Sequence, residues 1–407
     1  MRYRGCATLL VCVLFTLPWS AVADTAKGPI NRSNPKVGTR QVYRPDCNGN
    51  GVYDLSDISK KNSRDINQNG IPDECSSECD ATIIGRHQFG IIWDMLSWTV
   101  DYNNDGIIWL CLADGTEIVN PPDSFRGRIQ IPRDNVHLYA RPGDHVLIHN
   151  QKTNAGETNS DKTFYHSAIH VGNGRTGFRI SNVEVRTEGP DAVGIIVSGQ
   201  RSEVREIYGA TIRLSGDSYA AVLVHSLGYL ESLRNSKLEL CSWSGGGIRM
   251  YSSGMIHSIT ETSIYEPANA ICDTTAREAV RVEGQSWISR IDHLTIEIPH
   301  GNGIIVTSGS LVDFVEDLYL TTFGLFAVKV EPESYIGTLR SSFLANGYQY
   351  GWVVSAYGQP YPAIWNLENS VLLSPQHRWI APNSHLGKMN DVTCIGMDGR
   401  EETCPLP

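Results

Sequence analysis

The chain has 407 residues, of which 38 are glycine, 41% are hydrophobic and 19% are charged, with a net charge of −10. Glycine is only modestly above its usual ~7% share, which excludes a collagen-like chain, and the apolar fraction is large enough to bury a core. The acidic balance argues against nucleic acid as a partner.

Residues 1–23 have the composition of a secretory signal peptide. Arg2 and Arg4 give a basic start, an apolar run extends from Ala7 to Leu17, and Ala21–Ala23 supply small residues for cleavage. The apolar run is shorter than the roughly 20 residues that span a bilayer, and no later stretch is apolar over that length. We therefore expect a secreted, extracellular or cell-surface protein without membrane insertion.

Residues 24–45 are polar and contain prolines, which predicts a flexible linker. Two of the ten cysteines lie in the signal peptide. The remaining even number in an exported chain indicates disulfide bonds, and the absence of a Cys-x-x-Cys pair argues against zinc ligation by cysteines. The sequence does not fix the pairing, but proximity favours Cys47–Cys75, Cys79–Cys111, Cys241–Cys272 and Cys394–Cys404.

Residues 46–80 contain two loops with the ligand pattern of a calcium site, the second beginning 19 residues after the first. Alternate side-chain oxygens, a glycine at the sharp turn and one backbone carbonyl can surround a Ca²⁺ ion, which takes six to eight oxygen ligands. The expected ligands are Asp46, Asn48, Asn50, the Val52 carbonyl, Asp54 and Asp57 in the first loop, and Asp65, Asn67, Asn69, the Ile71 carbonyl and Asp73 in the second.

These tandem loops resemble the calcium repeats of thrombospondin type 3 and dockerin-like modules. A dockerin-like module implies a cohesin-type partner, although the short spacing and the flanking Cys47 and Cys75 lie closer to the thrombospondin-like pattern. The twelfth position of the second loop is Ser76 rather than an acid, so its ligand set is less complete. The alternative is a pair of Asn/Gly/Asp turns that bind no ion.

Residues 81–106 are expected to connect to and cap the main domain, a repeat covering residues 107–375. A short apolar alternation recurs at steps of 24 to 32 residues, centred on His170, Ile196, Leu223, Arg249, Arg281, Ile305, Lys329 and Val353. A turn residue between apolar stretches recurs over the same range of steps, at Asn182, Gly209, Asn235, Glu261, His293, Asp317, Ser341 and Asn369. Two landmarks that advance together indicate stacked units that bury a continuous core.

Alternation with period two predicts about three short strands in each unit and no helix. The repeats resemble the right-handed parallel β-helix of the pectate-lyase-like superfamily, and the bends at Asn182, Asn235 and Asn369 resemble that family's asparagine turn between the second and third sheets. The expected fold is all-β: a right-handed, single-stranded parallel β-helix preceded by a small calcium-loop module. Residues 376–407 break the pattern and are expected to cap the C-terminal end.

The chemistry is expected on the outward face of the first strand of each unit. There the middle residue of the landmark points outward, and so does the residue two positions further on. Units stack about 4.8 Å apart, so these side chains are expected to form one polar patch. It occupies the sheet on which β-helix polysaccharide enzymes place their clefts. The candidate catalytic residues are Arg249, Tyr251, Arg281, Glu283, Lys329 and Glu331, with His225 beside them.

This patch favours a polysaccharide or glycan partner. Its cations can offset the carboxylate of an acidic sugar, and Arg281, Lys329 or Tyr251 can serve as the base of a lyase if its pKa is lowered. Alternatively, Glu283 and Glu331 lie two units and roughly 9.6 Å apart at the backbone, which suits an inverting hydrolase.

The competing interpretation is a ladder of solvated ion pairs on a non-catalytic, calcium- and disulfide-stabilised surface or matrix protein. The sequence lacks the Gly-His-Gly and Asp-Asp signatures of polygalacturonases, and it lacks the Asp-Pro-His-Asp motif of alginate epimerases. No catalytic residues of these families are therefore assigned to this chain. His170, His225 and His293 fall on different units and columns, which favours isolated surface histidines over a metal site.

Overall fold

The computed structural model describes residues 56, 59–60, 79–101, 105–121, 128–151, 167–189, 191–216, 218–242, 245–267, 277–357, 363–396 and 399–404. The chain divides into two compact units, Met1–Cys75 and Ser76–Pro407. In the first unit, the amide of Lys60 donates to the carbonyl of Ser56. The predicted signal peptide, linker, calcium ligands and Cys47–Cys75 pair lie outside the described residues.

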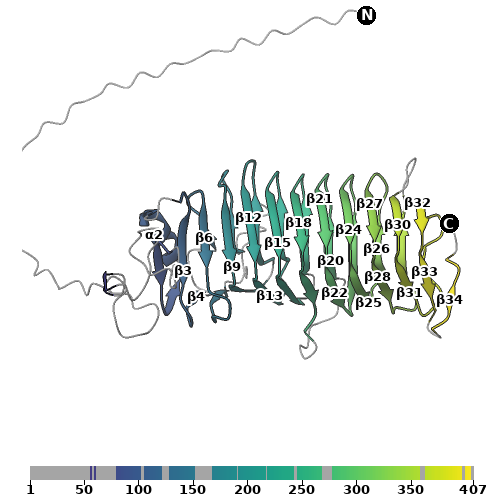
Figure 1. Ribbon diagram of the computed structural model, residues 1–407, viewed down its shortest axis with the longest axis horizontal. Coiled ribbons are helices and arrows are strands. Elements are labelled where there is room, and N and C mark those ends of the chain that lie inside the picture. The colour runs from purple at the N-terminus through teal and green to yellow at the C-terminus, as the bar shows by residue number, and fades with distance from the viewer. Residues whose placement is uncertain are drawn as a thin grey trace, which may run out of the picture. The chain divides into compact units, whose positions relative to one another are not determined.

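The second unit is a parallel β-solenoid of about ten turns with three long sheets, A, B and C, and its coils follow one another along the stack (Figure 1). Sheet A contains β1 (Ala81–Ile83), β3 (Ile108–Leu112), β6 (Val136–Tyr139), β9 (Phe178–Ser181), β12 (Glu203–Tyr208), β15 (Tyr229–Arg234), β18 (Met255–Thr260), β21 (Trp287–Asp292), β24 (Leu311–Glu316), β27 (Tyr335–Arg340), β30 (Ile364–Glu368) and β32 (Leu386–Asn390).

Sheets B and C complete each coil. Sheet B contains β2 (Arg86–Gln88), β4 (Glu117–Asn120), β7 (Leu147–Asn150), β10 (Glu184–Glu188), β13 (Thr211–Gly216), β16 (Lys237–Ser242), β19 (Ser263–Tyr265), β22 (Thr295–Ile298), β25 (Tyr319–Thr322), β28 (Phe343–Asn346), β31 (Val371–Leu373), β33 (Thr393–Ile395) and β34 (Glu401–Glu402). Sheet C contains β5 (Ile129–Gln130), β8 (Ser167–Val171), β11 (Val193–Ser198), β14 (Ala220–His225), β17 (Gly246–Tyr251), β20 (Arg277–Val282), β23 (Gly301–Val306), β26 (Phe326–Val330) and β29 (Trp352–Ala356).

The core consists of apolar ladders in which one residue per coil lies above its counterpart. In sheet C, Ile195, Val222 and Ile248 are in register and all are fully buried, and the ladder continues through Val280, Ile304 and Val328. Full burial of such a side chain contributes roughly 1.5–3 kcal/mol, so the stack is held by the repeated pattern that the sequence displays. The predicted all-β parallel solenoid is confirmed.

The predicted turn residues lie between sheets A and B and share one backbone conformation. All eight, from Asn182 to Asn369, have φ between 46° and 59°. This left-handed region redirects the chain within a single residue, and Asn and Gly adopt it most readily. Glu261, His293 and Asp317 adopt it as well, so the coil geometry is imposed even where the residue type is less suited.

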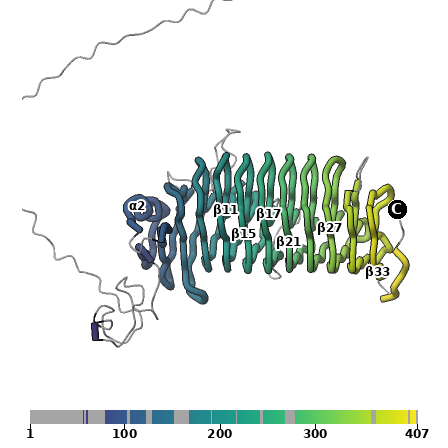
Figure 2. Tube along the Cα trace, turned by 45° about the horizontal axis from the view of Figure 1, so that its top comes forward, coloured from purple at the N-terminus to yellow at the C-terminus, as the bar shows by residue number. Residues whose placement is uncertain are grey.

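Both ends of the stack extend beyond the predicted range 107–375. At the N-terminal end, β1 and β2 begin sheets A and B, and α2 (Gly90–Trp98) adds a helix that alternation did not predict (Figure 2). Ile92 and Leu96, one helical turn apart, are its buried residues. At the end of the helix, the guanidinium of Arg133 donates to the carbonyl of Leu96 and to that of Thr99, the residue that follows the helix. No helix in the described part of the chain has the length and apolar character needed to cross a membrane.

At the C-terminal end, β32 and β33 continue sheets A and B, and β34 pairs antiparallel with β33. The predicted disulfides Cys394–Cys404 and Cys79–Cys111 are both present, one near each end of the unit. Cys241 is disulfide-bonded, and its predicted partner, Cys272, lies outside the described residues.

Candidate functional site

The outer face of sheet C carries the predicted column with one correction. His170, Ile196, Leu223, Arg249, Arg281, Ile305 and Lys329 are successive register partners. In the last coil, however, Lys329 pairs with Ser355, and Val353 is a fully buried core residue. The prediction for Val353 is wrong. In the other coils a small residue precedes the apolar landmark, and Gly351 fits that pattern, so the landmark of this coil was assigned two residues too early in the chain.

Arg249 and Arg281 are brought together by Glu278, a carboxylate that the sequence analysis missed. Glu278 Oε1 lies 2.6 Å from Arg281 Nη1, and its Oε2 lies 3.5 Å from Arg249 Nη2. Arg281 Nε also lies 2.7 Å from Glu283 Oε2. Burial alone lowers the pKa of Arg281, but the two carboxylates outweigh it and raise that pKa above its ordinary value.

Glu278 was missed because the sequence analysis assumed that inward and outward residues alternate strictly, and the strand does not alternate at that point. Ala279 and Val280 are consecutive, and both are fully buried in the core. Two successive inward residues turn Glu278 to the same face as Arg281, whereas period two assigns it to the interior. The sequence did contain a signal for this irregularity. The residues equivalent to Ala279 in the neighbouring coils are Gly247 and Gly303, and residues this small can point inward directly before another core residue.

Aromatic side chains lie around the arginines. The guanidinium carbon of Arg249 is 4.3 Å from the ring centre of Tyr219, and the rings of His225 and Tyr251 stack with centroids 4.8 Å apart. Burial, Tyr219 and Glu283 raise the pKa of the Tyr251 phenol, and burial lowers the pKa of His225 to about 4. Below these rings, Leu223 is an outward residue that is nevertheless fully buried in a small apolar cluster.

Lys329 and Glu331 form a separate pair on the same face. Lys329 Nζ lies 2.6 Å from Glu331 Oε1, and the hydroxyl of Thr307 donates to Glu331 Oε2 at 2.6 Å. These hydrogen bonds from Lys329 and Thr307 lower the pKa of Glu331. Each of the three predicted cations therefore contacts a carboxylate, and the charges of these six side chains, Arg249, Glu278, Arg281, Glu283, Lys329 and Glu331, sum to zero.

His170 is buried rather than a surface histidine. Its Nε2 lies 2.7 Å from Ser198 Oγ, and Gly172 provides the room, because a Cβ there would come within 2.6 Å of the same nitrogen. Burial, followed by the charges of Arg128 and His225, lowers the pKa of His170 to about 3. The ring of His170 is almost fully buried, so the contact with Ser198 is structural.

The structure thus brings Arg249, Tyr251, Arg281 and Glu283 together and places Lys329 and Glu331 two coils further on. His225 lies beside Tyr251 as expected, and the structure adds Glu278 and Tyr219. Among the described residues, the metal-type grouping of side chains lies elsewhere, at the bends between sheets A and B. Comparison of the chain with models of protein families, with curated proteins and with solved structures finds no match.

Proposed function

We propose that the chain is an exported polysaccharide-active protein whose site lies on the outer face of sheet C, and that β-elimination of an acidic glycan is the reaction this site favours. The supporting observation is one cluster in which Arg249 and Arg281 flank Glu278 beside the stacked rings of His225 and Tyr251. It combines cations, a neutral imidazole, a protonated phenol and aromatic faces within neighbouring coils.

β-Elimination requires a base, an acid and cations from such a site. A base removes the proton on the carbon next to the carboxyl group, a C=C bond forms as the adjacent C–O bond breaks, and an acid protonates the departing oxygen. Cations offset the charge that grows on the carboxylate, which is the service that Arg249 and Arg281 supply. Aromatic faces such as that of Tyr219 provide apolar contact for a sugar ring.

The acid and base assignments follow from the pKa directions. His225, with a pKa of about 4, is neutral at pH 7 and is assigned as the proton acceptor, a base about as weak as a carboxylate, while Tyr251, with a raised pKa, keeps its proton and donates it to the leaving oxygen. Both protons then exchange with water. Arg281 and Tyr251 are unsuited to the base role expected from the sequence, since each holds its proton more tightly than usual.

Inverting hydrolysis by Glu283 and Glu331 is favoured less. One carboxyl of such a pair must have a raised pKa in order to protonate the leaving oxygen. The pKa of Glu331 is lowered instead, and Glu283 is held by Arg281 at 2.7 Å. These carboxylates are better suited to holding the cations in place.

A panel of uronate and neutral polysaccharides tests the proposal, with unsaturated products read by ultraviolet absorbance and reducing ends measured separately. Tyr251→Phe is expected to lower kcat by about 10²-fold or more, the usual contribution of a general acid. Tyr265→Phe is the matched control, since it removes a phenol that contacts Glu239 on sheet B. Activity is expected in the absorbance channel. Reducing ends without unsaturated products would identify a hydrolase instead.

The second candidate is a non-catalytic glycan-binding or matrix protein, which the pairing of every column cation with a carboxylate favours. If neither unsaturated products nor reducing ends form with any polysaccharide of the panel, the enzyme hypothesis is rejected. Affinity electrophoresis in gels containing the same polysaccharides then separates the remaining cases. Retardation that is lost in an Arg249→Ala, Arg281→Ala double variant supports a glycan-binding face, and its absence rejects a glycan partner.

We also propose that residues 46–80 bind Ca²⁺ and that the protein acts outside the cell. The tandem loop pattern supports calcium, and the signal-like N-terminus together with the disulfides of the solenoid unit supports export. A cohesin-type partner remains the less favoured interpretation of the loops. Mass spectrometry under native conditions tests the first point by counting bound calcium ions.

A further inference from the structure

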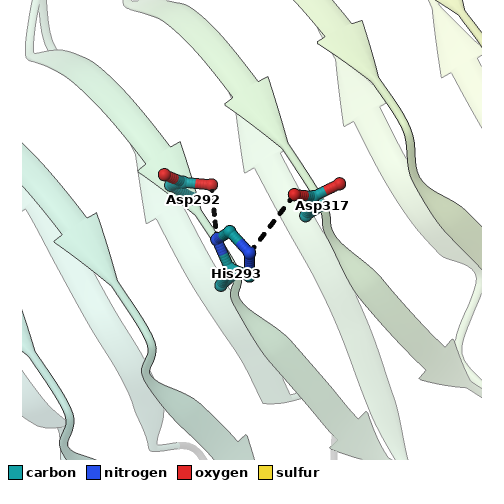
Figure 3. A group of neighbouring side chains, drawn as sticks. All are labelled: Asp292, His293 and Asp317. Carbon is teal, nitrogen blue, oxygen red and sulfur yellow. Dashed lines mark hydrogen bonds and ion pairs between the residues drawn. The ribbon is translucent and has the colours of Figure 1, made fainter.

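The bends between sheets A and B carry a side-chain cluster that the proposed glycan site does not use. His293 and Asp317 occupy consecutive bends, and Asp292 ends β21 beside His293 (Figure 3). One nitrogen or oxygen atom from each of the three side chains lies within 4.8 Å of the others. The cluster joins two adjacent coils of the solenoid.

Asp292 holds the imidazole in a defined orientation. Its Oδ1 lies 2.7 Å from His293 Nδ1, and its Oδ2 lies 3.2 Å from Arg290 Nη2. Arg290 is itself held by Glu316 at 2.9 Å. A carboxylate anchored in this way selects the tautomer with the proton on Nδ1, which leaves the lone pair on Nε2. This is the carboxylate–histidine arrangement that orients metal-binding imidazoles.

His293 Nε2 faces a second carboxylate at the separation that a shared ion requires. It lies 3.3 Å from Asp317 Oδ2, and the dashed lines of Figure 3 show both nitrogens of the ring engaged by carboxylates. Two ligands bound to zinc at about 2.1 Å in tetrahedral geometry are about 3.4 Å apart. The side chains of His293 and Asp317 are 62% and 42% exposed, so water can complete the coordination.

The local charges favour a cation beside Asp317. The nearby Arg290 and Arg340 are both engaged by Glu316, at 2.9 and 2.6 Å. In the part of the chain that the structure describes, the recorded ion pair of Asp317 is the one with His293. Within those residues, therefore, no lysine or arginine forms an ion pair with the carboxylate of Asp317.

We propose that His293 Nε2 and Asp317 Oδ2 bind one divalent transition-metal ion of the zinc class, with Asp292 as the positioning residue. An imidazole ligand selects zinc-like ions over Ca²⁺ and Mg²⁺, which prefer all-oxygen shells. The ligand chemistry thus differs from that of the 46–80 loops, whose expected ligands are all oxygens. The ion links the coil that contains β21 to the coil that contains β24, with open positions toward solvent.

Isothermal titration of the full-length chain with Zn²⁺, in buffer saturated with Ca²⁺, tests this site. One saturable site is expected, and His293→Asn should abolish it. Asparagine occupies the equivalent bends at positions 235 and 369 with positive φ, so this variant retains the fold. His300→Asn is the matched control, because His300 is 50% exposed and lies 3.2 Å from the carboxylate of Glu266. It should leave the zinc affinity unchanged.

Asp292→Asn separates the positioning role from ligation. It is expected to weaken Zn²⁺ binding by about 10- to 100-fold, the usual effect of losing a carboxylate that orients a ligand, whereas Asp317→Asn should weaken it further. Metal-free melting curves of each variant confirm folding. The proposal is overturned if no saturable Zn²⁺ binding occurs, or if His293→Asn and His300→Asn reduce affinity equally. Glycan activity plays no part in these readouts, so they are independent of the proposed function.

Discussion

Replacing Glu278 with glutamine removes the carboxylate that joins two arginines on the outer face of sheet C. The side chains of Glu278 and Arg249 are only 12% and 15% exposed, so the substitution takes a negative charge away from a nearly buried cation. Breaking a buried pair in this way costs about 3–5 kcal/mol, against about 0–1 kcal/mol at an exposed site. Arg281 keeps Glu283 at 2.7 Å, which places the expected loss near 3 kcal/mol.

Differential scanning calorimetry measures this loss as a change in Tm. An unfolding entropy of about 2.1 cal/mol/K per residue gives roughly 0.7 kcal/mol/K for the Ser76–Pro407 unit, so a loss near 3 kcal/mol lowers Tm by about 4 °C. Glu331→Gln is the matched control on the same face, since Glu331 is 37% exposed beside Lys329 and should change stability by less than about 1 kcal/mol. Equal shifts in the two variants would refute the assignment of Glu278 as a buried bridge.

Gly172→Ala should destabilise the fold by about 1–3 kcal/mol in chemical denaturation, because the new Cβ displaces the ring of His170, whereas Gly90→Ala, with open space around it, should not. The pKa values of His170 and His225, lowered to about 3 and 4 from 6.5, mean that the folded state binds fewer protons than the unfolded state below pH 6.5. Stability is therefore full above about pH 6.5 and falls as the pH approaches 4, and His170→Asn should flatten this dependence of Tm; an unchanged slope contradicts it. Chelation of calcium should lower the melting temperature of the 46–80 module, and an unaltered melt would count against the loops as calcium sites.

The solenoid was predictable because its signals repeat. Every predicted turn residue from Asn182 to Asn369 adopts the left-handed conformation, although the residue types differ. A single bend of this kind is weak evidence, but a bend that recurs in step with an apolar ladder leaves few alternatives. The same reasoning located Arg249, Arg281 and Lys329 on one face, since register in a parallel stack follows from the repeat length.

The failures occurred where strict alternation does not hold or where one coil differs from the others. Glu278 faces outward because Ala279 and Val280 both point inward, and a strict period of two cannot represent that irregularity. Val353 was assigned to the wrong register because Gly351 was taken for the small residue that precedes the apolar landmark in the other coils. The helix α2 has two buried residues one turn apart, and so short a pattern does not distinguish a helix from the neighbouring sequence. The pKa directions at Tyr251 and His225 depend on burial, which sequence does not specify.

The disulfide Cys79–Cys111 fastens the first coil to the next one, and Cys394–Cys404 ties the segment after β34 to β33 of the last coil. In a stack where each coil touches only the adjacent ones, unravelling starts most readily at an end, because a terminal coil has one neighbour to lose instead of two. Fastening the first coil covalently makes unravelling from the N-terminal end depend on the redox state of the surroundings. Under oxidising conditions the first coil cannot separate from the second, whereas after reduction digestion can proceed from that end inward, coil by coil.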